Sequence, residues 1–186
     1  MPSFLGDGLI FEESLPVAWT AGPLVKDMDL ARLNADNHQL LGAESSLEEV
    51  RVPEALKDES TALLHEMQRL EFKLNVLLRL TAEIARQQNA LPPARLVRFS
   101  ARGLEWIGAD APAVAATGLI DLYINSALPQ PLRLPGRVIG EHFHKDLRAA
   151  EIQFSGLSEP VVEFIEKLIF RRHRRLIAGA RSTPSP

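Results

Sequence analysis

Residues 54–91 carry the feature that most constrains this chain, a hydrophobic repeat with a period of seven residues. The residues at this interval are Leu56, Leu63, Leu70, Leu77, Ile84 and Leu91, and Met67 and Leu74 stand three residues before two of them. Such a repeat predicts one long helix whose a and d positions form a coiled-coil seam. Pro53 suits the first turn and Pro92 ends the helix, which would be about 55 Å long. A helix of that length cannot pack wholly against the rest of the chain, so we expect self-assembly.

Extra apolar residues beside the seam bear on how many chains assemble. Leu64 and Leu78 fall at e positions and Leu80 at a g position, which widens the apolar stripe beyond a dimer seam. We expect a tetramer. The pattern also allows another bundle, a dimer whose flank packs on a second helix, or a core helix of one domain. Thr81 and Gln88, both at a positions, weaken the seam and can fix its register.

The pattern of residues 27–41 predicts another helix, which precedes the long helix in the chain. Both helices would belong to a helical insertion that covers residues 24–93. Its apolar face consists of Leu30, Leu33, Leu40 and Leu41, with Asn37 among them. Gly42 is the expected end of this helix, and the serines at 45 and 46 offer the start of another one.

After Pro93 the pattern changes to short alternating runs punctuated by glycine, which indicates strands. The predicted strands are residues 95–99, 103–107, 119–124, 132–139 and 150–154. Residues 9–19 also read as extended, and because a lone strand is not stable in water, we expect it to pair with the later strands. The expected organisation is therefore an N-terminal segment (1–23) that joins a β-domain and its closing helix (94–178), followed by a disordered tail (179–186).

Composition excludes several classes of protein. The chain has no cysteine, so disulfides are excluded and a reducing compartment is favoured. No apolar run reaches the roughly 18 residues of a membrane span, and the N-terminus does not read as a signal peptide. We expect a cytoplasmic protein that is not inserted in a membrane. Residues 61–186 carry 12 acidic and 17 basic side chains, an excess too small to predict nucleic-acid binding.

From Arg95 onward the order of elements resembles a PilZ domain, the bacterial cyclic di-GMP receptor family. Residues 98–103 (RFSARG) stand where that family has Asp or Asn, then x-Ser-x-x-Gly, and residues 118–124 and 132–139 resemble its central strands. Residues 150–154 and a closing helix complete the resemblance; the helix ends with Arg171, Arg172, Arg174 and Arg175. The resemblance implies an α+β fold, with a small PilZ-like antiparallel β-barrel and C-terminal helix beside the long coiled-coil helix.

The family's ligand motif is only partly present. Ser100 and Gly103 match it, but Arg98 replaces the Asp or Asn, and residues 1–19 contain none of the arginines that the family places before its first strand. These three residues are therefore read as a remnant ligand motif, and we expect cyclic di-GMP binding to be lost. The resemblance then implies a non-catalytic adaptor or scaffold in bacterial signalling (motility, type IV pili or virulence) with an unidentified protein partner. The alternative is a working cyclic di-GMP receptor that uses Arg95, Arg98, Arg102 or the C-terminal arginines.

Other candidate sites are weak in the sequence. No phosphate loop, nucleophile elbow or pair of catalytic carboxylates is evident, so we expect neither an enzyme nor a cofactor. His142 and His144 could face one side of a strand, but with no third ligand nearby in sequence we expect no metal. The four arginines at 171, 172, 174 and 175 exceed what capping a helix needs, which favours contact with an anion or an acidic partner.

Overall fold

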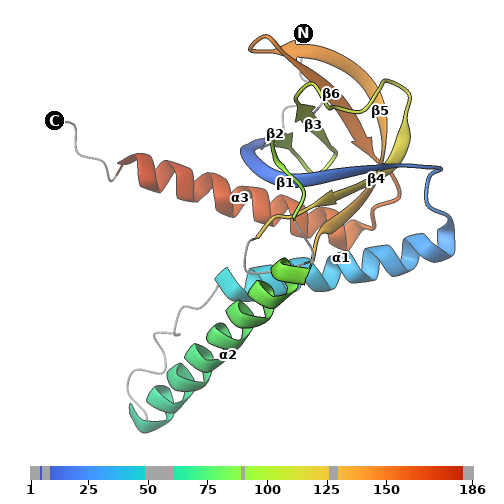
Figure 1. Cartoon of the computed structure of the whole chain (residues 1–186). Coiled ribbons are helices and arrows are strands. Elements are labelled where there is room, and N and C mark those ends of the chain that lie inside the picture. Colours follow the sequence, from blue (N-terminus) through green and yellow to red (C-terminus); the bar gives the residue numbers. More distant parts are fainter. Residues whose placement is uncertain (1–4, 6–8, 49–60, 89–90, 126–129, 182–186) are drawn as a thin grey trace.

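A computed structural model describes the chain except residues 1–4, 6–8, 49–60, 89–90, 126–129 and 182–186. The elements in chain order are β1 (Phe11–Ala21), α1 (Asp27–Glu48), α2 (Thr61–Gln88), β2 (Ala94–Phe99), β3 (Gly103–Ile107), β4 (Thr117–Leu122), β5 (Leu132–His144), β6 (Leu147–Phe154) and α3 (Glu159–Arg181). Figure 1 shows a β-barrel above two helices, with α2 extending away from both. The fold is the predicted α+β combination of a small antiparallel barrel, a closing helix and a long helix.

The six strands close into one antiparallel barrel with the order β1-β2-β3-β6-β5-β4. β1 pairs with β2 through its first half (Phe11↔Phe99 to Pro16↔Ala94) and with β4 through its second half (Val17↔Leu122 to Ala21↔Gly118). The helical segment therefore separates β1 from its two partners in the sequence but not in space. Closure matters because an open barrel would leave unpaired strand edges.

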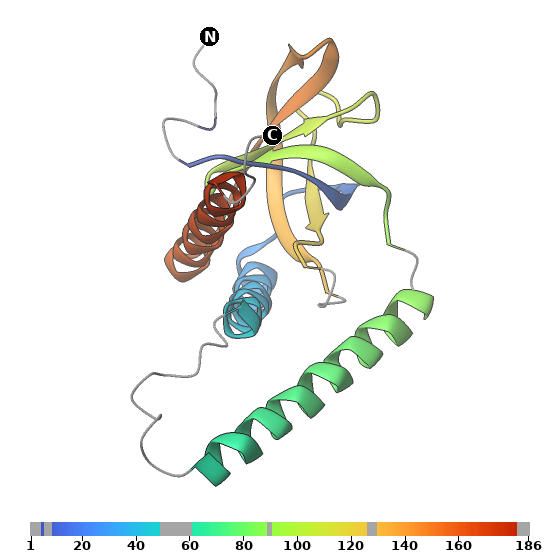
Figure 2. The same ribbon diagram turned by 90° about the vertical axis from the view of Figure 1, so that its left-hand side faces the viewer.

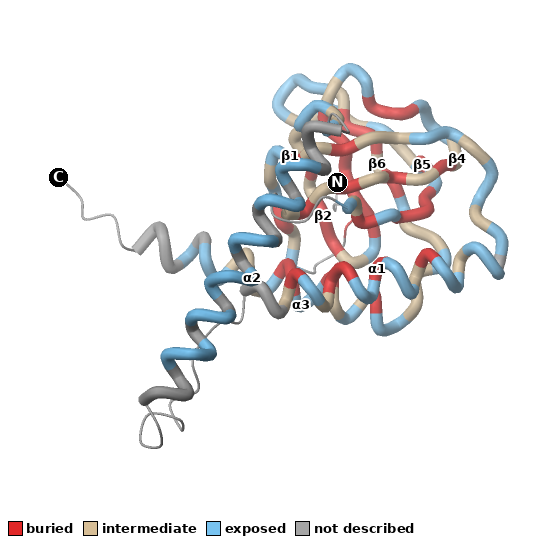
Figure 3. The backbone as a smooth tube through the Cα atoms, turned by 60° about the horizontal axis from the view of Figure 1, so that its bottom comes forward, coloured by how far each residue is buried: buried red, intermediate tan, exposed pale blue. Residues whose placement is uncertain are grey.

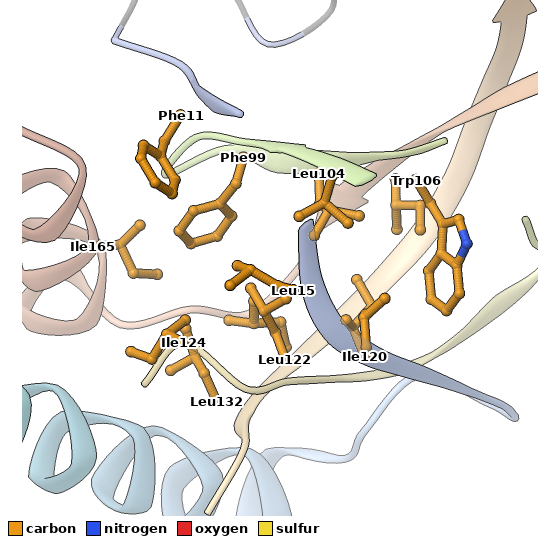
Figure 4. Packing of buried hydrophobic residues seen from close by; sticks show 14 of the residues in the cluster. Phe11, Leu15, Phe99, Leu104, Trp106, Ile120, Leu122, Ile124, Leu132 and Ile165 are labelled. Atoms are coloured by element: carbon orange, nitrogen blue, oxygen red, sulfur yellow. The ribbon is translucent and has the colours of Figure 1, made fainter. Parts of the chain in front are cut away.

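Alternation along the strands fills the barrel interior with branched and aromatic side chains. In β4, for example, every second residue is buried, including Ile120 and Leu122. Figure 4 shows Phe11, Phe99 and Ile165 grouped at one end of this cluster and Trp106 at the other. The core thus continues from the barrel into α3.

Helices α1 and α3 pack against each other beneath the barrel (Figure 2). The predicted apolar face of α1 is buried at Leu33, Leu40 and Leu41, and Asn37 is buried with it. Gly42 does not end the helix, because α1 continues through Glu48, so the predicted restart at the serines is wrong. The face that packs on α3 persists past Gly42 through the buried Glu44, which explains why the helix continues.

Two other boundaries differ from the sequence analysis. β5 and β6 form a hairpin longer than predicted, joined by Lys145 and Asp146, whose positive φ values of 50° and 66° suit a tight hairpin turn. Helix α3 continues to Arg181, so residues 179–181 belong to it rather than to the tail. The remainder of the predicted tail and the first part of the predicted long helix lie outside the described residues.

Candidate functional site

The a and d positions of α2 form an exposed apolar stripe, called the seam below. Its members with described side chains, Met67, Leu70, Leu74, Leu77 and Ile84, are each more than half exposed. Figure 3 shows the described part of α2 exposed along its length, in contrast to the buried stretches of α1. Leu91, beyond the helix, is 37% exposed, the side chain of Leu63 is not described, and Leu56 lies outside the described residues.

Burying the seam would contribute substantial free energy. A leucine-sized side chain moved from water to a core contributes about 1.5–3 kcal/mol. Thr81, the polar residue at an a position, donates its hydroxyl to the carbonyl oxygen of Leu77 at 3.0 Å. Its polar group is therefore satisfied within its own helix, so burying it costs little.

The remnant motif forms the turn between β2 and β3. Ser100 is buried, its backbone N–H donates to the carbonyl oxygen of Gly103 at 2.9 Å, and its Oγ accepts from the N–H of Arg102 at 3.2 Å. Ser100 and Gly103 therefore have a local structural task, which is to hold this tight turn. Neither residue needs a ligand to be satisfied.

Arg98 is turned along the outer face of the sheet toward two carboxylates. Its Nη1 donates to Oε2 of Glu105 at 2.5 Å, and its Nε lies 3.7 Å from Oε2 of Glu12. The Glu105 side chain is almost fully buried at 1% exposure, so this charge-assisted pair is shielded from water. Arg98, which replaces the family's Asp or Asn, is thus neutralised by the carboxylates of Glu105 and Glu12 on the neighbouring strands.

A cavity of about 630 Å³ lies between the N-terminal segment, the β2–β3 turn and α3. It is lined by Leu5, Leu9, Ser100, Ala101, Arg102, Glu166, Lys167, Ile169 and Phe170. The mixture of apolar walls with a few charged groups is typical of a ligand or partner pocket. The sequence analysis missed its α3 residues, among them Phe170, whose 50% exposure is visible only in the structure.

The structure separates the arginines that the sequence analysis grouped. Arg171 donates to Oε2 of the buried Glu44 at 2.7 Å, and Arg172 donates to Oε2 of Glu13 at 2.6 Å and to the carbonyl oxygen of Ile124. These two cations connect α3 to α1 and to β1. Only Arg174 and Arg175 of the four are exposed, and the anion or partner contact stays a prediction.

No helix in the described part of the chain is long and apolar enough to cross a membrane. The fold and its sites define a small β-barrel recognition domain joined to a helix with an exposed heptad seam. A family model described as "Atypical PilZ domain, cyclic di-GMP receptor" matches residues 41–182. The chain therefore belongs to the atypical PilZ domain family, whose domains act as receptors or adaptors rather than enzymes.

Among solved structures, a Xanthomonas campestris protein is similar over 92% of each chain, with a TM-score of 0.73 and 25% sequence identity. It is described as a pathogenic protein with a new tetrameric PilZ domain, self-assembled via an unusual helical bundle. No curated protein matches the chain. The resemblance to PilZ domains expected from the sequence is thus confirmed for family and fold.

Proposed function

We propose that this chain is a non-catalytic PilZ-domain scaffold that assembles as a tetramer through α2. The observation that supports this most is the exposed seam on a helix that stands apart from the barrel and from α1 and α3 (Figure 2). In a monomer this stripe would stay in water. The chain would then lack the favourable free energy that assembly gains by burying at least five large side chains. The tetrameric assembly of the Xanthomonas campestris neighbour supports the same arrangement here.

In such a tetramer, four barrels would be displayed around one helical bundle. Each barrel would offer its cavity and the exposed end of α3 to a bacterial protein partner, in motility, type IV pilus function or virulence. Several weak contacts presented together can bind far more strongly than one, because the later contacts become intramolecular.

The solution mass tests the assembly. Light scattering coupled to size exclusion should give four times the chain mass of 20.6 kDa at micromolar concentration. A mass equal to one chain would contradict the proposal. A mass equal to two chains would retain self-assembly through the seam but reject the tetramer.

We also propose that the remnant motif does not bind cyclic di-GMP with useful affinity. The ligand carries two phosphates, and the guanidinium available at the motif, that of Arg98, already serves Glu105 and Glu12. Releasing it would leave a buried carboxylate without its partner, which costs about 1–3 kcal/mol or more. Each 1.4 kcal/mol weakens binding about tenfold.

A second candidate function is a cyclic di-GMP receptor that uses the cavity, which Ser100 of the remnant motif also lines, rather than Arg98. The family's description as a cyclic di-GMP receptor favours it, as do Arg102 and Lys167 at the cavity wall. Calorimetry with cyclic di-GMP decides between the two candidates. A dissociation constant below about 10 μM, or roughly −7 kcal/mol, would establish the receptor.

If binding is seen, two variants locate it. Arg102→Ala should abolish binding at the cavity, whereas Arg137→Ala, which removes an exposed arginine of β5, should leave it unchanged. Loss of binding in both variants would indicate nonspecific attraction of the phosphates.

A further inference from the structure

We propose a divalent-metal site on the outer face of the barrel, formed by Glu105 of β3, His142 of β5 and Glu151 of β6. One ligand atom from each of these residues lies within 4.8 Å of the other two. The sequence analysis considered His142 with His144 and found no third ligand nearby. The fold supplies two, because β3, β6 and β5 are consecutive strands of the sheet and bring Glu105 and Glu151 close to His142.

The two carboxylates of the site lie close enough to repel each other, and a cation between them would relieve this repulsion. Glu105 and Glu151 lie directly opposite each other in the β3–β6 ladder. Like charges at directly opposed positions destabilise a sheet, and burial of Glu105 strengthens the repulsion. A bound cation would convert this repulsion into attraction.

The charges on neighbouring strands do not balance the site. Arg98 brings one positive charge to Glu105, but it also faces Glu12, and the acidic groups at 12, 105 and 151 outnumber it. Lys145 is 3.7 Å from Glu12, at the exposed edge of the group, so its charge is largely screened by water. Arg98 and Lys145 are therefore shared among the three carboxylates of this face.

His142 is placed to be a ligand. Its Nδ1 lies 3.1 Å from Oε1 of Glu151 and its Nε2 lies 4.0 Å from Oε2 of Glu105. Nδ1 is shielded from solvent and makes no hydrogen bond of acceptable geometry among the described residues. Two ligand atoms on one tetrahedral metal ion lie about 3.4 Å apart for bonds of about 2.1 Å, so small side-chain rotations suffice.

Two further residues support the geometry. A Cβ added at Gly140 would lie 2.9 Å from Oε2 of Glu151, so the missing side chain makes room for this carboxylate beside His142. Arg98 holds Glu105 from the opposite side, as outer hydrogen-bond partners of metal-ligating carboxylates do. A carboxylate has lone pairs enough to accept from Arg98 and bind a metal at the same time.

The donor set indicates the kind of metal. One imidazole with two carboxylates suits Zn²⁺ and also Mn²⁺ or Fe²⁺, and water can complete the coordination because His142 and Glu151 are partly exposed. A bound ion would fasten the β5–β6 hairpin to β3. That hairpin presents Phe143, which is 79% exposed, so the metal would control how firmly this apolar tip is held.

Metal titration of the chelator-treated full chain tests the site. Zn²⁺ should bind one ion per chain in calorimetry and raise the melting temperature, and Co²⁺ should give a visible absorption band typical of protein ligands. His142→Gln and Glu151→Gln should each weaken binding by about 10–100-fold or more. Gly140→Ala should also weaken binding, although it removes no ligand. His144→Gln is the matched control and should bind as the unmodified chain does.

The same measurements can overturn the proposal. Absence of saturable Zn²⁺ and Co²⁺ binding would do so, as would binding that is unchanged in both ligand variants. Because metal ligands must be deprotonated, the Zn²⁺ effect on the melting temperature should be larger at pH 8 than at pH 6. A Zn²⁺ effect that is equal or larger at pH 6 would also contradict the site.

Discussion

Asn37 of α1 and Arg133 of β5 exchange two hydrogen bonds between a side chain and a backbone. The Asn37 Nδ2 donates to the carbonyl oxygen of Arg133 at 2.6 Å, and the backbone N–H of Arg133 donates to Asn37 Oδ1 at 2.9 Å. The β5–β6 pairing ends at Gly136↔Phe154, so Arg133 has no strand partner on that side. One buried amide thus replaces a missing strand and fixes α1 against the barrel.

Replacing Asn37 should destabilise the fold. In Asn37→Ala both backbone groups of Arg133 lose their partner, and an unsatisfied buried group costs about 1–3 kcal/mol. We expect chemical denaturation to show a loss in that range. Asp36→Ala, one residue away on the exposed side of α1, is the control and should change stability by less than about 0.5 kcal/mol. Equal stabilities of the two variants would show that the amide exchange is dispensable.

Charges placed in the seam of α2 should separate the chains. In the double variant Leu70→Asp and Leu77→Asp, assembly would bury unpaired carboxylates, which costs several kcal/mol. Light scattering should then report the mass of one chain. Phe72→Asp is the matched control, because Phe72 is an exposed residue of the same helix at an f position, outside the seam. Dissociation by the control as well would place the interface elsewhere on the helix.

The N-terminal strand should be essential even though it precedes the residues that match the family model. Deleting residues 1–22 removes β1, which opens the barrel and exposes the edges of β2 and β4. We expect the shortened chain to lack a cooperative thermal transition. A chain that begins at Leu9 keeps β1 and should melt cooperatively. A dispersed amide spectrum from the shorter fragment would show that the remaining five strands suffice.

Replacing either of two aspartates, Asp121 and Asp110, by asparagine should change the stability of the fold, and the two changes should have opposite signs. Burial raises the pKa of Asp121 above its ordinary value of 3.8, although the Arg133 guanidinium at 3.4 Å opposes this. The folded state thus binds the proton more readily than the unfolded state, so Asp121 costs stability once the pH rises above its folded pKa. Asp121→Asn should therefore raise the melting temperature at pH 7, and the gain should vanish below about pH 3.8.

Asp110 provides the comparison. Burial alone would raise its pKa, but hydrogen bonds from Arg95 and Trp106 outweigh that effect and lower it. Its charge therefore contributes stability at neutral pH that is lost as the pH falls. Asp110→Asn should lower the melting temperature at pH 7, by a small amount because the side chain is 46% exposed. The measurement is the melting temperature of both variants at pH 7. If both substitutions raised it, or both lowered it, this assignment would be contradicted.

The sequence by itself determined the periodic parts of this protein. The seven-residue repeat needs only the geometry of one helix, so Met67, Leu70 and Leu77 could be assigned to one face without knowing their neighbours. Strand alternation and glycine punctuation likewise located the β-half, and the order of motifs indicated the family. These signals are local, because they depend on residues a few positions apart.

Only the tertiary structure decided which charges meet. Arg98 could be read as a cation in a ligand motif, but the registers of β1, β2 and β3 place it between Glu12 and Glu105. Arg171 finds Glu44 across 127 residues, and His142 comes close to Glu105 because β6 pairs with both β3 and β5. No local pattern encodes such pairs, since strand register and helix docking follow from packing of the whole core. The sequence therefore indicated the surface through which the chain would assemble, and the fold decided which polar groups remain available to bind something else.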